Sequence, residues 1–238
     1  TTTPWTLPSN TALAVGAKIT YIDIETYNPY TGAHIIVTLA EALLSKFFKE
    51  ENKVDSLPPY DASQKSIPWK ALHTCKGSDL AGQTYEQLLP YAQPEDGDAF
   101  RVITGDFVST EDGTGIVHIA PSFGADDFRV AKQNGIGSLT LVDKKGRFVP
   151  EVIDFSGEFV KAAYLSPEEQ AEEAAKQGRD KYLSVDERIS IKLKTENKAF
   201  KVERYEHTYP HCWRTDKPIL YYPLESWFIK TTAVKDRM

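Results

Sequence analysis

The chain has 238 residues and a formal net charge of −6; 41% of its residues are hydrophobic and 26% are charged. This composition is that of a globular protein rather than a disordered chain, and no apolar run reaches the ~18–20 residues of a membrane span, so we expect a soluble protein. The negative charge argues against broad nonspecific binding to nucleic acid, and two distant cysteines without a CxxC motif predict no disulfide framework and a reducing, cytoplasmic setting.

The chain opens with TTTPWTLPSN, in which four threonines and two prolines fall within eight residues. It begins without Met or a leader, so we expect a processed end or a segment of a longer protein. β-Branched residues suit a strand and hydroxyls suit a cap or a turn, so a purely structural role is one interpretation. The other is a rigid rim of hydroxyl groups that binds a polar, uncharged ligand such as a nucleoside or a water molecule.

The next segments predict strands followed by a helix. Residues 12–16, 18–26 and 34–38 are strand-like, and Asn28–Pro29 with Thr31–Gly32 predicts a turn between the last two. Residues 38–51 have a helical apolar face, and Thr38 with Glu41 forms a potential capping box. The stretch 52–69 is rich in Pro and Ser and is expected to be a loop.

The middle of the chain alternates again. We expect strands at 73–77 and 99–110, and a strand at 113–124 that runs into a Pro/Gly turn. A short helix is predicted at 125–135, with acidic residues in its first turn and Gly135 beyond its end. Residues 138–149 resemble a hairpin around Lys145–Gly146.

Two helices and an extended segment complete the pattern. The sequence SPEEQAEEAAKQG predicts a helix that Ser166 caps, with Pro167 in its first position and Gly178 after its end. A further helix is expected at 185–196, and 199–232 is predicted to be extended. Because strands outnumber helices, we expect a mainly β fold, a mixed β-barrel with peripheral helices.

The densest concentration of reactive side chains lies in DGTGIVHIAPSFGADDF. Gly113 and Gly115 allow a bend or a close approach to a ligand, His118 follows on a strand, and Asp126 and Asp127 open a helix. Taken singly, a strand histidine is more often a core residue, and paired aspartates more often complement a helix dipole. A glycine-rich strand, a histidine and two carboxylates within fifteen residues together suggest the wall of a pocket.

Two other motifs are weaker. HTYPHC brings His207, His211 and Cys212 together, but Pro210 breaks any helix that would align the histidines and no second cysteine pair exists, so we predict no metal site. DGTG is similar to the Asp-Thr-Gly loop of aspartic proteases, but Gly113 separates the aspartate from the threonine and no second copy is present.

With these motifs in view, the chain resembles the editing insertion of the isoleucyl-tRNA synthetase family over essentially its whole length. TTTPWTLPSN is similar to the threonine-rich peptide of that family, and Pro4 after three threonines distinguishes it from the Thr-Thr-Arg-Pro of the valyl and leucyl enzymes. GTGIVHIAPSFGADD resembles the second editing motif, and YPHCWRTDKPILYYPLESWF resembles the strand that returns to the catalytic body.

The resemblance implies a closed, barrel-like editing domain at residues 1–205, with helical segments around 160–197, and an extended return segment at 206–238 toward an absent catalytic domain. Motifs of the His-Ile-Gly-His and Lys-Met-Ser-Lys-Ser types are missing. The chain is therefore expected to need no cofactor, whereas the longer enzyme, a ligase for isoleucine and tRNA, uses ATP and Mg.

The implied activity is hydrolysis of the ester of Val-tRNA(Ile), and also of valyl-adenylate. In this interpretation Asp127 pairs with the substrate ammonium, His118 limits the size of the amino-acid side chain, and Asn10 supports the hydroxyl rim. Gly113 and Gly115 complete the substrate-binding residues. Thr1, Thr2 and Thr3 would complete the catalytic set with Asp127. Together with Thr6, which is a substrate-binding residue, they would line the adenosine and water positions.

No residue is an obvious general base, so positioning of a water molecule, aided by the terminal ribose hydroxyl, is the expected mechanism. The expected partners are the aminoacylated 3′ end of tRNA(Ile), its valine moiety and valyl-adenylate, with no membrane. From Arg179 onward the chain has 13 Lys and Arg residues against 9 Asp and Glu residues, a local excess that is compatible with contact to a phosphate backbone. A non-catalytic tRNA-binding module is the alternative.

Overall fold

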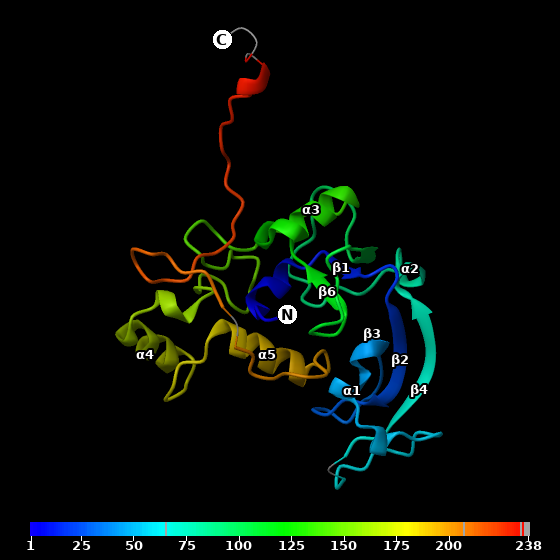
Figure 1. Cartoon of the computed structure of the whole chain (residues 1–238). Coiled ribbons are helices and arrows are strands. Elements are labelled where there is room, and N and C mark those ends of the chain that lie inside the picture. The colour runs from blue at the N-terminus through cyan, green and yellow to red at the C-terminus, as the bar shows by residue number, and fades with distance from the viewer. Residues whose placement is uncertain (65, 207, 234, 236–238) are drawn as a thin grey trace.

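The computed structural model describes all residues except 65, 207, 234 and 236–238. Its described strands form two three-stranded sheets (Figure 1). In the first sheet β1 lies in the centre, pairs in parallel with β5 and pairs antiparallel with β6. These three strands are Ala12–Val15, Arg101–Thr104 and Ile116–Ile119, respectively. The register places Leu13 opposite His118, so the central strand fixes the backbone of that histidine.

The second sheet is antiparallel, with β2 between β3 and β4. Its strands are β2 Thr20–Tyr27, β3 His34–Ala40 and β4 Trp69–Lys76. The predicted turn between β2 and β3 is confirmed, since Gly32 N–H donates to Asn28 O (2.8 Å) and Gly32 has φ +71°. β4 begins at Trp69, where the sequence predicts a loop, because its first residues pair with the end of β2.

The two sheets meet at one corner. There Tyr21 is fully buried and its hydroxyl donates to Gly115 O (2.6 Å), while Ala40 N–H donates to Thr114 O (2.8 Å). The described strands nevertheless remain in two separate sheets. The observed fold is thus a mixed α/β arrangement, and the expected barrel closure is not shown.

The expected helix over 38–51 is wrong. β3 continues through Ala40, and only short turns follow it: the 3₁₀ helix η2 (Glu41–Leu43), α1 (Leu44–Phe47) and η3 (Glu50–Asn52). The Thr38 hydroxyl donates to Asp23 Oδ1 across the strands (2.6 Å) instead of capping a helix. Burial of Leu39 and Ala40 against the other strands outweighs their helical spacing.

The later helices of the described chain are α2 (Gly77–Leu80), η4 (Pro121–Phe123), α3 (Ala125–Gln133), η5 (Ala162–Tyr164), α4 (Pro167–Lys176), α5 (Val185–Thr195) and η6 (Thr231–Ala233). The predicted helices α3, α4 and α5 agree with the sequence, whereas the sequence does not predict the short helices α2, η4, η5 and η6. The Ser166–Glu169 capping box is confirmed, and Ser184 with Glu187 forms a second one at the start of α5. The hairpin predicted at 138–149 is reduced to a turn with one bridge, Val142–Phe148.

A large apolar cluster joins the helical part to the N-terminal stretch. Trp5, Phe148 and Ile189 are buried together in it, so α5 packs directly on the segment that contains the threonines. No helix among the described residues is both long and apolar enough to cross a membrane.

The C-terminal segment first packs on the body and then leaves it (Figure 1). Tyr164 Oη donates to Pro218 O (2.8 Å), and Tyr222 Oη donates to Val142 O (2.9 Å). Beyond these contacts the trace extends away, and the side chains of Trp227 and Phe228 are exposed.

Candidate functional site

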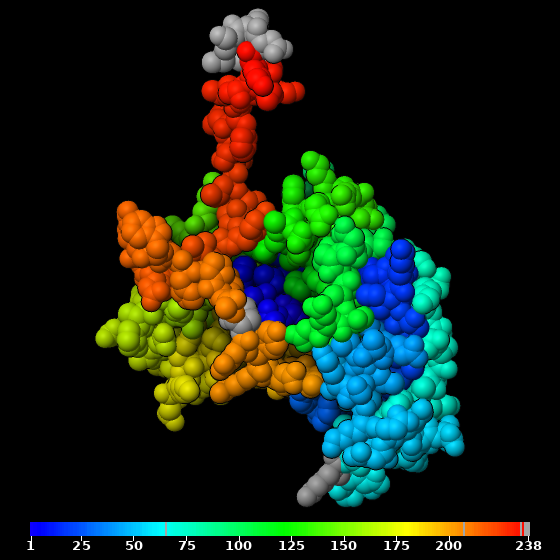
Figure 2. Space-filling model, in the orientation of Figure 1, coloured from blue at the N-terminus to red at the C-terminus, as the bar shows by residue number. Residues whose placement is uncertain are grey.

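The threonine-rich stretch forms a 3₁₀ helix, η1 (Pro4–Ser9), that leads into β1. Pro4 occupies its first turn, where a missing N–H is harmless and φ is already suitable. Trp5 and Thr6 are buried, whereas Thr1 and Thr2 are exposed. Figure 2 shows this segment, in blue, at the bottom of a hollow in the molecular surface.

Hydrogen bonds tie the threonines to one another and to the histidine of β6. Thr1 Oγ1 accepts from Thr3 N–H (3.1 Å) and lies 3.4 Å from Thr3 Oγ1. The Thr6 hydroxyl lies 2.8 Å from Thr3 O, to which it donates, and 3.0 Å from His118 Nε2. The structure therefore brings Thr1, Thr3, Thr6 and His118 together, whereas no hydrogen bond of the Thr2 side chain is among those described.

Asn10 lies on the other side of the imidazole. It is buried, and its Nδ2 donates to Ala12 O (2.9 Å) and lies 3.4 Å from His118 Nδ1. Its Oδ1 accepts from the Tyr85 hydroxyl (2.6 Å). No sequence signal selects Tyr85, because it lies between predicted elements and outside every motif.

His118 is neutral at physiological pH in this environment. Burial lowers the pKa of His118 to about 4. Both ring nitrogens lie within hydrogen-bonding distance of polar side chains. The imidazole is thus an uncharged group whose orientation is fixed by hydrogen-bonding partners at both ring nitrogens.

Asp127 lies beside the end of β6, in the first turn of α3. Its Oδ2 accepts from Ala120 N–H (2.9 Å), two residues after His118 in the chain. Burial raises the pKa of Asp127, and the charge of Asp126 adds to this effect, while the Ala120 hydrogen bond opposes it. Among the ion pairs of the described residues none includes Asp127, so this half-buried carboxylate has no cationic partner among those residues.

Asp126 has a different environment. It is exposed and pairs with Arg129, whose Nη2 lies 3.0 Å from Asp126 Oδ1, and Gly124 occupies the helix N-cap without a side-chain cap. The two neighbouring aspartates are therefore distinguished by structure: one forms a surface ion pair and the other faces inward.

The two glycines of the motif lie at the opposite end of β6. Gly115 has φ +75°, and a Cβ there would come within 2.5 Å of Ala40 Cβ, so this position requires glycine for packing between the sheets. Gly113 is exposed, with φ +66°, and a Cβ added there would meet open space. Their role in substrate binding stays a prediction.

A further acidic residue, Asp186, forms a hydrogen bond to the backbone of η1. Asp186, in the first turn of α5, accepts from Trp5 N–H through Oδ1 (2.8 Å). Burial raises the pKa of Asp186 and lowers that of Lys161, whose Nζ lies 5.6 Å from the centroid of the Trp5 ring. Sequence reasoning missed Asp186, because an acid at a helix start is already explained by the helix dipole.

The disfavoured metal motif is only partly described. His207 lies outside the described residues, and His211 Nδ1 lies 2.9 Å from Tyr209 O. Within the described part of the chain, no three His, Cys, Asp or Glu side chains lie close enough to hold a metal ion.

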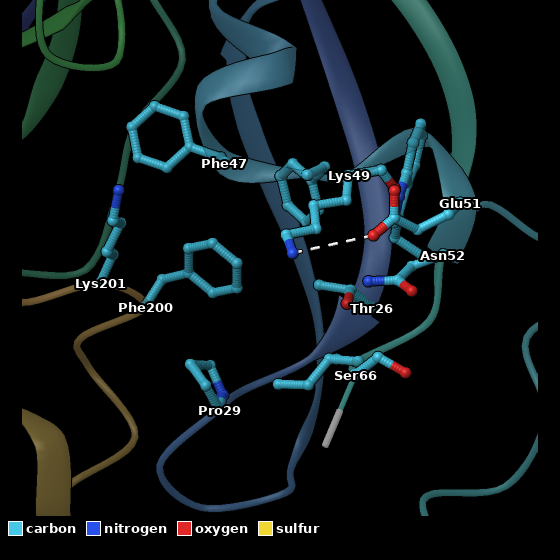
Figure 3. Close-up of a pocket in the computed structure, with 12 residues that line it drawn as sticks. Thr26, Pro29, Phe47, Lys49, Glu51, Asn52, Ser66, Phe200 and Lys201 are labelled. Carbon is cyan, nitrogen blue, oxygen red and sulfur yellow. Dashed lines mark hydrogen bonds and ion pairs between the residues drawn. The ribbon is translucent and has the colours of Figure 1, made fainter. Parts of the chain in front are cut away.

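A separate cavity of about 320 Å³ lies beside α1 and β2 (Figure 3). Aromatic rings line it, and two lysines stand at its edge, each paired with a glutamate: Lys49 with Glu51 and Lys201 with Glu203. None of the residues around His118 or Asp127 contributes to it.

The chemistry of the first site follows from its groups. Hydroxyls and backbone carbonyls can bind ribose or water, a neutral imidazole can fill space and hydrogen-bond, and an inward carboxylate can bind an ammonium group. The arrangement suits a ligand that is both hydroxylated and cationic.

Comparison with known proteins adds a family relationship. An isoleucine–tRNA ligase of Cytophaga hutchinsonii is 65% identical over 248 aligned residues, which include all of this chain and 22% of that protein. Those of Porphyromonas gingivalis and Thermoplasma volcanium are 48% and 40% identical, again over the whole chain and over 22% and 19% of each relative. The chain thus spans about a fifth of the length of these curated relatives.

Other comparisons contribute less. No family model matches the chain. A solved structure described as "The crystal structure of GlLeuRS-CP1" aligns with 56% of this chain and 41% of that chain, at 21% identity and a TM-score of 0.39. At this TM-score the likeness does not establish a shared fold.

Proposed function

The chain is homologous over its whole length to about a fifth of the length of proteins of the isoleucine–tRNA ligase family, and from this premise we propose that it is an editing domain that hydrolyses Val-tRNA(Ile). The observation that supports the proposal is the hydroxyl, imidazole and amide network of η1 and β6, together with the half-buried carboxylate of Asp127, which accepts from Ala120 N–H two residues after His118. The same site would accept valyl-adenylate, which presents the same valyl ammonium and an adenosine.

Amino-acid selection creates the physical need for such a site. Isoleucine and valine differ by one methylene, which an apolar pocket distinguishes by only about 1–3 kcal/mol. A second pocket that admits valine and excludes isoleucine, and hydrolyses whatever enters, supplies the missing accuracy.

Asp127 would bind the α-ammonium of the valyl group and so orient the ester. A raised pKa means that the bound ammonium also helps to keep this carboxylate ionised. Thr1, Thr2, Thr3 and Thr6 would contact the terminal adenosine and the attacking water, with Asn10 holding the imidazole.

In the reaction, the water oxygen forms a bond to the ester carbonyl carbon, and the bond from that carbon to the ribose oxygen breaks. The proton of the water passes to the leaving ribose oxygen, directly or through the neighbouring ribose hydroxyl, so the products are valine and tRNA(Ile). His118 is a poor general base with a pKa of about 4, so its proposed role is steric: it limits the length of the amino-acid side chain.

The wider assignments belong to the same proposal. Residues 1–205 would form the editing domain and 206–238 a segment that returns toward a catalytic domain, where the longer protein would use ATP and Mg to charge tRNA. The corner hydrogen bonds between the sheets support a barrel-like editing fold. The chain itself would need no cofactor and would work in the cytoplasm.

A non-catalytic tRNA-binding module is the second candidate, favoured by the basic excess after Arg179. One experiment separates the two: mix the chain with Val-tRNA(Ile) carrying labelled valine, and measure both complex formation and release of valine. The editing proposal predicts release with turnover, whereas binding without release would support the module.

A further inference from the structure

Tyr85 lies at the end of a hydrogen-bonded series that reaches the proposed site. Its backbone N–H donates to Phe100 O (2.8 Å), and its ring packs edge-on against Phe100 at 6.1 Å between centroids. Its hydroxyl donates to Asn10 Oδ1 over 2.6 Å, a short contact. Burial raises the pKa of Tyr85, so the phenol remains a donor at neutral pH.

The amide of Asn10 can adopt only one orientation here. Nδ2 faces two backbone carbonyls, Ala12 O (2.9 Å) and Ile119 O (3.4 Å), and a carbonyl accepts only from a donor. The oxygen Oδ1 must therefore face Tyr85. With the amide fixed, the group that faces His118 Nδ1 at 3.4 Å is also the NH₂.

This orientation sets the tautomer of the imidazole. Because Asn10 presents a donor, Nδ1 of neutral His118 must be the acceptor, and the ring proton lies on Nε2. Nε2–H then donates to Thr6 Oγ1 (3.0 Å), and the Thr6 hydroxyl donates onward to Thr3 O (2.8 Å). Every hydrogen bond in the series points from Tyr85 toward the threonines.

We propose that Tyr85 is a positioning residue. Through Asn10 it fixes His118 in its Nε2–H tautomer, and the hydrogen bond from Nε2–H in turn fixes the position of the Thr6 hydroxyl, which bonds to Thr3, for hydrolysis. The activity part of this inference rests on the proposed function, whereas the tautomer part does not. Without the phenol, the buried Oδ1 of Asn10 loses its donor and the side chain is held only through Nδ2, so the NH₂ group can move away from His118 Nδ1. The Thr6 hydroxyl, which lies 3.0 Å from His118 Nε2, can then donate to that nitrogen, which would favour the Nδ1–H tautomer.

The test compares Tyr85→Phe, which keeps the ring and removes the hydroxyl, with Tyr27→Phe. The Tyr27 hydroxyl donates to Pro58 O (2.7 Å), in an exposed contact outside this series. In protein with ¹⁵N-labelled histidine, NMR at neutral pH reports which ring nitrogen of His118 carries the proton. The kinetics of Val-tRNA(Ile) hydrolysis are measured on the same samples.

We expect a protonated Nε2 in the wild-type protein and in Tyr27→Phe, and a mixture of tautomers in Tyr85→Phe. We also expect Tyr85→Phe to lower kcat roughly tenfold, about what one hydrogen bond contributes, with KM little changed. An unchanged tautomer in folded Tyr85→Phe, or a changed tautomer with full activity, would overturn the proposal. If the wild-type chain hydrolyses nothing, the editing function fails, and the NMR comparison still decides the role of Tyr85.

Discussion

At the scale of single residues, two adjacent aspartates give opposite expectations. Asp126 is exposed and paired with Arg129, whereas Asp127 is half-buried and bonded to the Ala120 N–H. An inward carboxylate without a cation among its described ion pairs is the group best placed to bind an ammonium. Their contrast provides a matched pair of variants for the proposed site.

We expect Asp127→Ala to lower the rate of Val-tRNA(Ile) hydrolysis by at least about 100-fold, because the ester is no longer oriented. Asp126→Ala should retain activity and lose no more than about 1 kcal/mol of stability, as is usual for a surface ion pair. Hydrolysis rates and thermal melts of both variants check this. Full activity in folded Asp127→Ala would remove that residue from the site.

His118 tests the steric part of the proposed function. A packed imidazole resists displacement by about 1–3 kcal/mol, the usual penalty for overpacking, which corresponds to about one to two decades of discrimination. His118→Ala should therefore begin to hydrolyse Ile-tRNA(Ile) while it still clears Val-tRNA(Ile). A folded variant that still spares Ile-tRNA(Ile) would show that the histidine only supports the core.

The lowered pKa of His118 also predicts how stability depends on pH. The folded pKa is about 4 and the unfolded value is 6.5, so between these values the unfolded chain binds more protons. The His118 contribution to the free energy of unfolding is therefore fully present above about pH 6.5 and is lost as the pH falls toward 4.

Replacing His118 by Gln should make the free energy of unfolding depend less on pH between pH 4 and 7. Urea unfolding at several pH values measures this dependence. His211→Gln is the control, because that side chain is exposed. Parallel curves for the wild-type protein and His118→Gln would contradict the assignment of a neutral, buried imidazole.

At the scale of elements, η1 is held between β6 and α5. Asp186 accepts from Trp5 N–H. Loss of this carboxylate would leave the buried N–H unpaired, which lowers the free energy of unfolding by about 1–3 kcal/mol. We expect Asp186→Ala to lower stability by this amount and to reduce hydrolysis, whereas Asp186→Asn, which keeps an acceptor oxygen, should recover most of both.

Glu168→Ala is the matched control, since Glu168 lies in the first turn of α4 and is exposed. It removes the same favourable interaction with a helix dipole but no tertiary hydrogen bond. Equal losses for Asp186→Ala and Glu168→Ala in chemical unfolding would show that Asp186 acts only through the dipole.

How far the sequence determines these elements varies along the chain. Ser166, Pro167 and Glu169 specify their helix locally, so α4 can be predicted almost to the residue. The segment after Thr38 cannot, because Leu39 and Ala40 belong to β3 through pairing with Ile22 and Tyr21 of β2. Ala40 N–H also donates to Thr114 O, far along the chain.

The same contrast holds for the candidate site. His118, Asp127 and the threonines stand in recognisable motifs, so the sequence alone selects them. Tyr85 and Asp186 act through long-range hydrogen bonds that leave no local pattern, and only the structure reveals them.

At the scale of the whole molecule, the proposed site lies where three distant segments meet. The N-terminal stretch supplies the threonines, and β6 with α3 supplies His118 and Asp127. Helix α5 holds the N-terminal stretch in place through the hydrogen bond from Trp5 N–H to Asp186. The cavity by Phe47 is separate from this site. Catalysis by positioning depends on all three segments, so selectivity should be a property of the folded chain.

The measurement that tests the proposed editing function most directly is the ratio of hydrolysis rates for Val-tRNA(Ile) and Ile-tRNA(Ile), with the purified chain in excess under single-turnover conditions. An editing domain predicts rapid loss of the valyl ester, at least about tenfold faster than that of the isoleucyl ester, and no such loss with Asp127→Ala. Equal rates for the two esters, or a valyl ester that persists as long as it does in buffer alone, would contradict it.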